Sequence, residues 1–458
     1  MSVAPHSATP ATLPPGPRLP RVGQTLAWTV RPTQLMERCR ARYGDTFTLR
    51  FAHGETWVFL SHPDAIKQVF TGDPRLLHAG EANEVLRPVL GDRSVLLLDE
   101  SAHMEQRKLM LPPLHGERMQ RYGELMAEAA AREVEMWPVG VPTRVLPGMQ
   151  RVTLEVIMRA VFGVADGERS DRLRSAVRGL LAWTTDRRQL LALAALGPSR
   201  VRGNQSFAAA IDPVHRLLVE EIERRRRDPA LAERDDILSL LVQARHEEGS
   251  AMSDVELRDE LMTLLLAGHE TTATSLAWTI ELLMRHPAAL ERLTEEVRSG
   301  EDAFLDAVIK EALRIRPVIP VVLRLLKEPM EIGGWDLPAA VAVAPCIYLV
   351  HRRPDIYPEP DRFIPERFLD RAAGTYTWIP FGGGVRRCLG ASFAQFEIAA
   401  VLPEIVGRLS LRPARRRPER VSRRAISFAP SRGTEVVVEG REGVERDAPR
   451  PREPAHAA

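Results

Sequence analysis

The segment FGGGVRRCLG, from Phe381 to Gly390, combines residue types that can hold a metal ion. Its cysteine, Cys388, comes directly before LGASFAQFEIAAVLPEIVGRL, a stretch with helical periodicity. Amides and the dipole at a helix N-terminus favour a thiolate over a thiol. Glycines let a backbone approach a large flat group, and Arg386 can point away from the cysteine toward an anion. The alternative is a tight turn that contains a small buried cysteine.

A second polar cluster, AGHETT from Ala267 to Thr272, interrupts the apolar stretch LMTLLLAGHETTATSLAW. The capping-box pattern at Ser253–Glu256 predicts the start of a helix that continues to His286. At 1.5 Å per residue this helix would be about 50 Å long and would cross the whole molecule.

The residue types in AGHETT indicate proton chemistry. The Thr271 hydroxyl can bond the carbonyl of Ala267, four residues back, and Glu270 beside it could pass protons inward. An ordinary solvated Glu-Thr face is the alternative. A zinc protease is excluded, because Ala273 stands where HExxH requires its second histidine.

Two charged pairs have the spacing of one helical face. In ESAHMEQRK, His103 and Arg107 are four residues apart and could meet one anion, such as a propionate or a phosphate. In EALR, Glu311 and Arg314 could form a bidentate ion pair, and PERF supplies a further arginine, Arg367. In isolation each pair is more often surface decoration that contributes a few tenths of a kcal/mol.

Composition narrows the class of protein. Lys and Arg number 63 against 61 Asp and Glu in 458 residues, a balance of +2 that gives no sign of nucleic-acid binding. The three cysteines, Cys39, Cys346 and Cys388, are too far apart for a disulfide framework or a CxxC zinc site, which favours the cytoplasm. There is no run of about 18 apolar residues and no secretion signal, so we expect no membrane span.

Periodicity favours a mainly α protein with a small β portion. Helical patterns dominate between Ser101 and Arg316, whereas DTFTLRF and ETWVFL alternate as a hairpin with its turn at His53-Gly54. We expect a flexible proline-rich N-terminus over 1–20, a single domain over 21–440 and a disordered tail over 441–458.

Together these motifs resemble the cytochrome P450 family of haem-thiolate monooxygenases, in its soluble bacterial type. FGGGVRRCLG matches the cysteine loop, AGHETT the oxygen-activating helix and EALR the Glu-x-x-Arg helix, with PERF between EALR and the cysteine loop. The resemblance covers roughly Pro14 to Gly440. It implies the cytochrome P450 fold, with the haem between the long central helix and the cysteine-loop helix.

The resemblance also implies a role for each matching residue. Cys388 should be the axial thiolate ligand of haem b, an arrangement that favours O–O cleavage. Phe381 should pack near the sulfur. The propionates should be held by His103, Arg107, Arg324 and Arg386, and the cysteine loop should be supported by a buried network of Glu311, Arg314 and Arg367.

Thr271 and Glu270 match the alcohol–acid pair of the family. Oxygen activation needs two protons and no leak of water, which a hydroxyl backed by a carboxylate relay provides. The pair favours oxygen-dependent monooxygenation. A haem-thiolate isomerase or dehydratase and a haem-binding sensor are the alternatives.

The chain contains no dinucleotide fingerprint, so electrons should come from a ferredoxin with its reductase or an equivalent donor. Seven arginines between Arg412 and Arg424 could attract an acidic partner, although a solvated basic loop fits them equally well. The expected pocket walls are mostly Leu, Val, Ile and Ala, which favours an apolar substrate such as a terpenoid, fatty acyl chain or alkane. These walls lie in 76–98, 180–207, at Leu264 and Ala267, and in 318–322. We also expect O2 as the co-substrate and a monomeric protein.

Overall fold

The computed structural model describes residues 13–114, 118–163, 167–186, 204–370 and 373–441. The helices are α1 Arg21–Val30, α2 Pro32–Tyr43, α3 Pro63–Thr71, α4 Ala79–Ala82, α5 Arg87–Leu90, α6 Glu100–Met110, α7 Arg118–Glu135, α8 Val145–Phe162, α9 Glu168–Thr185, α11 Gln205–Arg226, α12 Ile237–Gln243, α13 Asp254–Arg285, α14 Pro287–Ser299, α15 Ala303–Ile315, α16 Ile347–Val350 and α17 Ala391–Val406. The strands are β1 Thr46–Arg50, β2 Thr56–Leu60, β3 Leu77–His78, β4 Pro142–Arg144, β5 Arg324–Leu326, β6 Met330–Ile332, β7 Trp335–Leu337, β8 Ala342–Pro345, β9 Leu409–Pro413, β10 Val421–Arg424, β11 Ser427–Pro430 and β12 Glu435–Arg441. The mainly α class with a small β portion is confirmed.

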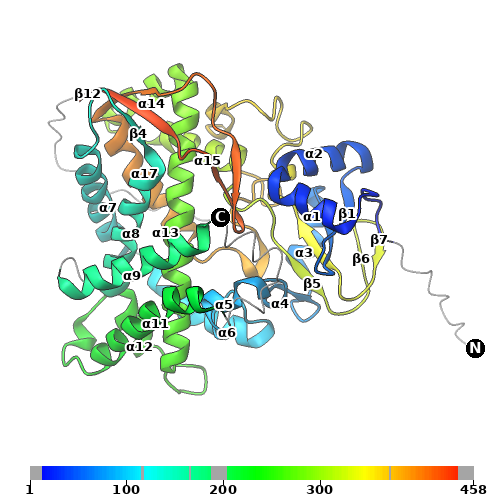
Figure 1. The fold of residues 1–458 in the computed structure, drawn as a ribbon, viewed down its shortest axis with the longest axis horizontal. Helices are drawn as coiled ribbons and strands as arrows, with labels where there is room; N and C mark the ends of the chain where they lie inside the picture. Colours follow the sequence, from blue (N-terminus) through cyan, green and yellow to red (C-terminus); the bar gives the residue numbers. More distant parts are fainter. Residues whose placement is uncertain (1–12, 115–117, 164–166, 187–203, 371–372, 442–458) are drawn as a thin grey trace, which may run out of the picture.

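The long helix α13 runs through the middle of the molecule from one edge to the other (Figure 1). Its predicted capping box is present: the Ser253 hydroxyl accepts from the Glu256 amide at 3.2 Å, and the Glu256 carboxylate accepts from the Ser253 amide at 2.8 Å. Helices α8, α11, α15 and α17 pack against it. A helix surrounded on its sides can be apolar all round, so the polar AGHETT stretch needs a specific reason.

The predicted hairpin forms the edge of the largest sheet. Strands β1 and β2 pair antiparallel from Thr46 opposite Leu60 to Arg50 opposite Thr56, and Gly54 takes a φ of +93° in the turn. Within the described residues the sheet order is β1-β2-β8-β5-β3. β8 pairs with β2 in parallel and with β5 in antiparallel fashion, which fixes Arg324 at the first residue of β5.

The proline-rich entry is hydrogen-bonded to the sheet where it is described. The carbonyl of Pro14 accepts from the Thr48 hydroxyl at 2.7 Å, and the carbonyl of Pro15 accepts from the Thr48 amide at 2.9 Å. Residues 1–12 of the predicted flexible N-terminus, and 442–458 of the predicted tail, lie outside the described residues.

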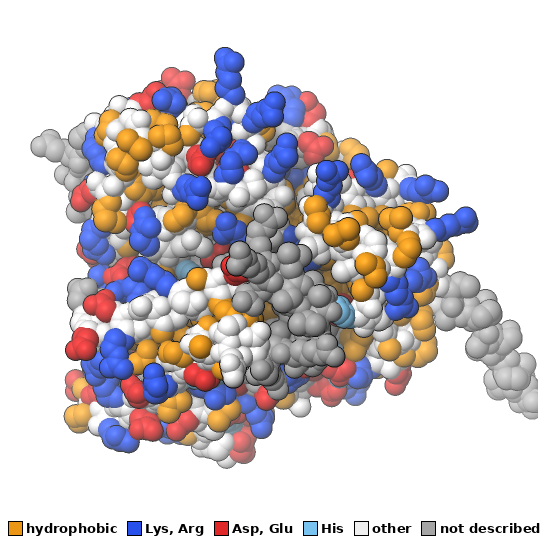
Figure 2. Space-filling view, viewed as in Figure 1, with side chains coloured by type: hydrophobic (Ala, Val, Ile, Leu, Met, Phe, Trp, Pro, Cys, Tyr) orange, Lys and Arg blue, Asp and Glu red, His pale blue; other side chains and the backbone are white. Residues whose placement is uncertain are grey.

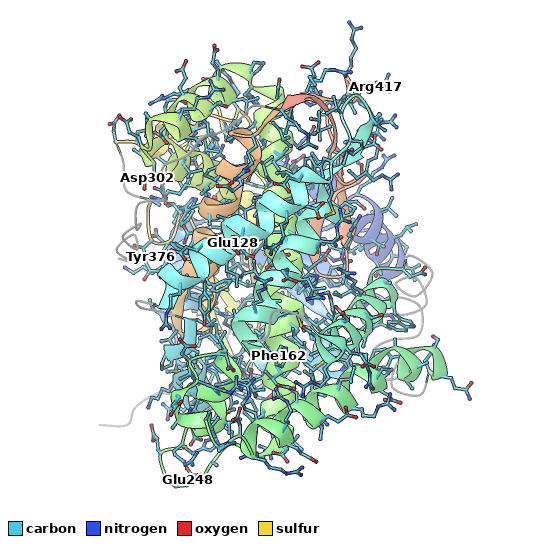
Figure 3. All side chains as sticks on the ribbon, turned by 90° about the vertical axis from the view of Figure 1, so that its left-hand side faces the viewer. Glu128, Phe162, Glu248, Asp302, Tyr376 and Arg417 are labelled. Carbon is cyan, nitrogen blue, oxygen red and sulfur yellow. The ribbon has the colours of Figure 1, made fainter. Side chains whose placement is uncertain are left out.

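The helical side of the molecule is layered around α13. Figure 3 shows α7, where Glu128 is labelled, crossing in front of the layer in which Phe162 ends α8. Glu248, which precedes α13, lies at one end of the molecule. Arg417, whose carbonyl accepts from Arg285 in the last turn of α13 at 3.1 Å, lies near the other (Figure 3).

The arginine run Arg224–Arg227 at the end of α11 is not uniformly exposed. Arg225 is fully buried and forms an ion pair with Asp236, while its second terminal nitrogen donates to the Phe162 carbonyl at 2.7 Å. It therefore ties α11 to α8. No helix among the described residues is long and apolar enough to cross a bilayer.

Candidate functional site

The cysteine loop closes on itself immediately before α17. The Cys388 amide donates to the Phe381 carbonyl at 3.0 Å, and α17 begins three residues later, at Ala391. Gly382 and Gly384 take φ values of +70° and +65°, which L side chains rarely adopt.

The reason for the glycines differs in part from the one expected. A Cβ on Gly384 would lie 2.1 Å from the Phe70 carbonyl oxygen, and one on Gly383 would lie 2.2 Å from the Phe70 ring. These glycines therefore allow the loop to pack against the end of α3. Of the four glycines in the cysteine loop, Gly390 alone has open space where its Cβ would stand, as expected for a position facing a planar ligand.

The Cys388 thiol lies on an internal surface of the protein. Its side chain has accessible area, yet burial is the main effect on its pKa, which it raises. A side chain that has accessible area and is also surrounded by protein is one that faces a hollow inside the fold. A hydrogen bond from the backbone of Gly390 and the charges of Arg107 and Arg387 act in the opposite direction and lower the pKa.

Three arginines and a histidine from three separate parts of the chain converge beside this thiol. They are His103 and Arg107 on α6, Arg324 on β5, and Arg386 in the cysteine loop. Burial, followed by the charges of the three arginines, lowers the pKa of His103 to about 3. Burial lowers the pKa values of Arg324 and Arg386 to about 10. All four predicted propionate-binding residues are thus brought together.

The cluster has fewer negative partners than positive charges. Arg386 is paired with Asp99, and Arg324 donates to the carbonyl of Leu323 at 2.8 Å. No hydrogen bond or ion pair reaches the Arg107 guanidinium from the described residues. Buried cations without counter-charges are costly, so the cluster fits a ligand that carries carboxylates. The residues present therefore fit a haem with two propionates.

The middle of α13, which packs against α17, has accessible area within AGHETT. Ala267 is exposed although residues 272–284 of the helix are buried. The Thr271 hydroxyl donates to the Ala267 carbonyl at 2.7 Å, which weakens the regular helical ladder there. A Cβ on Gly268 would lie 3.2 Å from Ile157, so this glycine serves the close packing of α8 on α13.

The structure does not join the acid to the alcohol. The Glu270 carboxylate accepts from the side-chain amide of Gln150 on α8 at 2.6 Å. Its other oxygen is buried and has no hydrogen-bond partner among the described residues. Glu270 is therefore turned toward α8, and no hydrogen bond in the described structure links it to Thr271.

Glu311, Arg314 and Arg367 form one buried network. Arg314 donates to both carboxylate oxygens of Glu311, at 2.6 and 2.8 Å, and both side chains are fully buried. Arg367 donates to Glu311 at 3.1 Å. Arg314 also donates to the carbonyls of His351, Pro360 and Arg362, at 2.6, 2.8 and 3.2 Å, so all of its side-chain N–H donors are used.

His351, which sequence reasoning missed, connects this network to the cysteine loop. Its Nδ1 contacts the Arg314 carbonyl at 3.1 Å, and its Nε2 accepts from the Ile379 amide at 2.9 Å, two residues before Phe381. Burial lowers the pKa of His351 well below its ordinary value, so the ring is neutral and can donate at one nitrogen and accept at the other. The Phe381 ring packs edge-on against Trp378 with its centroid 6.3 Å away.

Asp99 is another functional neighbour that sequence reasoning missed. It holds Arg386, and it also accepts from the backbone amides of Gly80 and Glu81, at 2.8 and 2.9 Å. A signal was present, because Asp99, His103 and Arg107 follow one another at four-residue intervals. This spacing puts the Asp99 carboxylate one helical turn before His103 and two turns before Arg107.

Residues 93–95, which precede Asp99, are hydrogen-bonded to acidic side chains of α13. Asp259 accepts from the Arg93 amide at 2.9 Å, and Glu260 accepts from the Val95 amide at 2.7 Å. Asp259 and Glu260 are both fully buried. Acidic residues in the second turn of the long helix therefore position the chain next to the cation cluster.

We expect the Glu260→Gln variant to gain stability relative to the wild type as pH rises from 5 to 8. Burial raises the pKa of Glu260 from 4.5 to about 8, so the folded protein keeps a proton that the unfolded chain has lost. Wild-type stability therefore falls with rising pH in this window, and a glutamine removes that slope. Thermal unfolding midpoints at several pH values measure the difference.

Glu256→Gln is the control for this prediction. Glu256 lies one turn earlier on α13, and hydrogen bonds from Ser253, acting against burial, lower its pKa, so its stabilising effect is present above 4.5 and lost only below it. This variant should show no relative gain between pH 5 and 8. A Glu260→Gln variant whose difference from the wild type is constant with pH would contradict the prediction.

Comparison with known proteins places this chain in a family. The family model for cytochrome P450 matches residues 13–435. Cytochrome P450 135B1 of Mycobacterium tuberculosis is 42% identical over 93% of this chain and 91% of its own length. Cytochrome P450 137 of the same species is 38% identical over 92% and 90%.

Solved structures show the same fold. A cyanobacterial CYP120A1 with bound retinoic acid superposes with a TM-score of 0.81 at 24% identity, over 93% of this chain and 99% of that one. The haem domain of cytochrome P450DA gives a TM-score of 0.80 at 25% identity, over 97% and 99%. The chain belongs to the cytochrome P450 family. Members of this family are haem- and iron-binding monooxygenases, and this protein is therefore an oxidoreductase.

Proposed function

We propose that Cys388 is the axial ligand of haem b and that the protein inserts one oxygen atom of O2 into an apolar substrate. The observation that carries this proposal is the convergence of the Cys388 thiol with a buried cation cluster that has one carboxylate, Asp99. His103, Arg107, Arg324 and Arg386 would hold the propionates. When bound, a haem with a thiolate ligand supplies the iron at which O2 is activated.

Thr271 would hold and pass protons on the α13 side of the site. Its hydroxyl donates to the Ala267 carbonyl, so the oxygen can accept a proton from a second donor on the exposed side. Glu270 has one carboxylate oxygen without a partner in the described structure and could hold the next proton after turning from Gln150. Both residues act by general acid–base chemistry.

We expect Thr271→Ala to keep haem and substrate binding while most of the oxygen consumed no longer appears in product. The hydroxyl loss removes the proton holder, and the effect of one such group on the productive step is roughly 10²-fold or more. Product formed per O2 consumed is the measurement.

The matched control is Thr279→Ala. Thr279 lies on the same helix and makes the same bond to the carbonyl four residues back, at 2.8 Å, but it is buried away from AGHETT. It should leave the ratio of product to O2 unchanged. An unchanged ratio in Thr271→Ala would overturn the role given to Thr271.

The substrate is proposed to be a terpenoid, a fatty acyl chain or an alkane-like molecule. Within the described parts of the predicted walls, apolar side chains are at least partly accessible at Leu98, Leu264, Ala267 and Val322. Residues 187–203 of those walls lie outside the described residues. Apolar walls of this kind select by shape and burial of surface.

Electrons are proposed to come from a ferredoxin and its reductase, or an equivalent donor, in the cytoplasm. Arg387 is exposed next to Cys388 and would attract an acidic protein to this side. The arginines of 412–424 give weaker support for an acidic electron donor, because Arg412 and Arg415 are already paired with Glu439 and Glu435.

Cys39 and Cys346 are free buried thiols, as a reducing compartment such as the cytoplasm allows. We also propose that 21–440 acts as a single haem domain and as a monomer.

Incubation with a surrogate ferredoxin system and a panel of lipids and terpenoids tests the proposal. Hydroxylated or epoxidised product that carries oxygen from O2 is the expected result. Turnover of an added peroxide without O2 would instead support an isomerase or dehydratase. The absence of any spectral response of the haem to every apolar compound would support a sensor.

A further inference from the structure

Helix α1 exposes an apolar face where a surface helix normally exposes a polar one. Val22, Leu26 and Val30 are 70, 61 and 62% exposed and follow one another at four-residue intervals along one side. Leu19, just before the helix, extends the line and is 53% exposed. The buried side carries Gln24 beside Trp28, so the usual arrangement is partly inverted.

The same stretch is basic and lacks acidic residues. Between residues 13 and 36 the chain contains Arg18, Arg21 and Arg31 and no aspartate or glutamate. All three arginines are exposed, and none of their side chains has a hydrogen-bond or ion-pair partner among the described residues. Figure 2 shows hydrophobic side chains gathered over the α1 and α2 end of the molecule, with Lys and Arg side chains around them.

A second element continues this basic surface. The β10–β11 hairpin packs beside α1, and the Arg423 guanidinium lies 5.5 Å from the centre of the Trp28 ring. The turn of the hairpin carries Ile426, which is 46% exposed. Leu19, Val22, Leu26, Val30 and Ile426, with Arg18, Arg21 and Arg31, are called the α1 surface below.

We propose that the α1 surface binds peripherally to a membrane that contains anionic lipids. A helix with an apolar face and flanking cations lies in the plane of the interface, its apolar side chains among the acyl chains and its arginines at the headgroups. No described helix could span the bilayer, so attachment would be at the surface. The inference goes beyond the proposed function and does not depend on it.

Charge argues against a second copy of the chain as the occupant. In a two-fold interface the same surface meets itself, so Arg18, Arg21 and Arg31 would face their own copies, and residues 13–36 contain no acid to compensate them. An anionic bilayer supplies the opposite charge around the whole apolar line. Each arginine near such a surface strengthens binding roughly fivefold.

The test uses the full-length, haem-loaded protein and sedimentation with vesicles. We expect binding to phosphatidylcholine vesicles that contain phosphatidylglycerol, weak binding to phosphatidylcholine alone, and release by high salt. The double variant Val22→Glu with Leu26→Glu should lose at least about tenfold in vesicle affinity. Both positions are exposed, so the fold should survive, which circular dichroism and the haem spectrum check.

Met136→Glu is the matched control, because Met136 is 65% exposed but lies after α7 and outside the α1 surface. It should bind vesicles as the wild type does. Equal vesicle binding by the double variant and the wild type would overturn the inference, as would no binding by the wild type. A wild-type dimer that the double variant converts to a monomer, without vesicle binding, would identify a second copy as the occupant. Turnover in the ferredoxin assay without vesicles should be the same in all three proteins. A negative result in the vesicle experiment would therefore not contradict the proposed function.

Discussion

Replacing Cys388 with alanine is expected to abolish the thiolate signature of the ferrous carbon-monoxide spectrum and all monooxygenase turnover. The thiol lies on an internal surface beside a cation cluster that fits propionates, and its two companion cysteines are buried elsewhere. Cys39 and Cys346 both lie in the buried cluster around β1 and β2, so neither is expected to replace Cys388. The carbon-monoxide difference spectrum of purified protein measures this directly.

Cys39→Ala is the control, since Cys39 is buried in the cluster around β1 and β2 and should leave the spectrum unchanged. Haem bound to the Cys388→Ala variant through the propionates alone should give a spectrum without thiolate character. A normal thiolate band in that variant would refute the assignment of Cys388. Haem retention measured beside the spectrum separates loss of the ligand from loss of the fold.

Arg314→Ala should cost about 3–5 kcal/mol of the free energy of unfolding, because it leaves the carboxylate of Glu311 buried without its main partner. The same change removes the donors to the carbonyls of His351, Pro360 and Arg362. His351 also accepts from the Ile379 amide, so we expect the cysteine loop to loosen and haem retention to fall. Chemical unfolding and the ratio of haem to protein are the measurements.

The chain contains a closely matched control pair. Glu359 and Arg362 have the same residue types and the same spacing as Glu311 and Arg314, and their side chains meet at 2.6 Å. They are 57 and 67% exposed, so Arg362→Ala should change stability by no more than a few tenths of a kcal/mol. Similar losses in the two variants would show that burial of Arg314 is not what makes its pair important.

Local patterns predicted the elements that carry the site. The capping box at Ser253 and the apolar run after it depend on residues within a few turns, and the predicted helix was confirmed. The β1–β2 hairpin was predicted for the same reason, because its register depends on alternation and a short turn. The resemblance of four short motifs in order was enough to predict the family, which the comparisons confirm.

These local patterns could not predict which distant residues each side chain contacts. Glu270 turns to Gln150, 120 residues away, and Gly383 faces Phe70 of α3. Arg225 belongs to a run of four arginines, which is typical of an exposed helix end, yet it is fully buried against Asp236. Each of these outcomes depends on which distant element packs against the residue.

By itself the sequence determined the class of fold and the family, together with the cysteine loop and the residue types in it, because periodicity, capping and motif spacing act over short stretches of chain. Only the tertiary structure decided that His103, Arg107, Arg324 and Arg386 form one cluster and that α1 turns its apolar side outward. Burial and charge pairing arise from contacts between segments hundreds of residues apart, and their free energy exists only once the chain has folded.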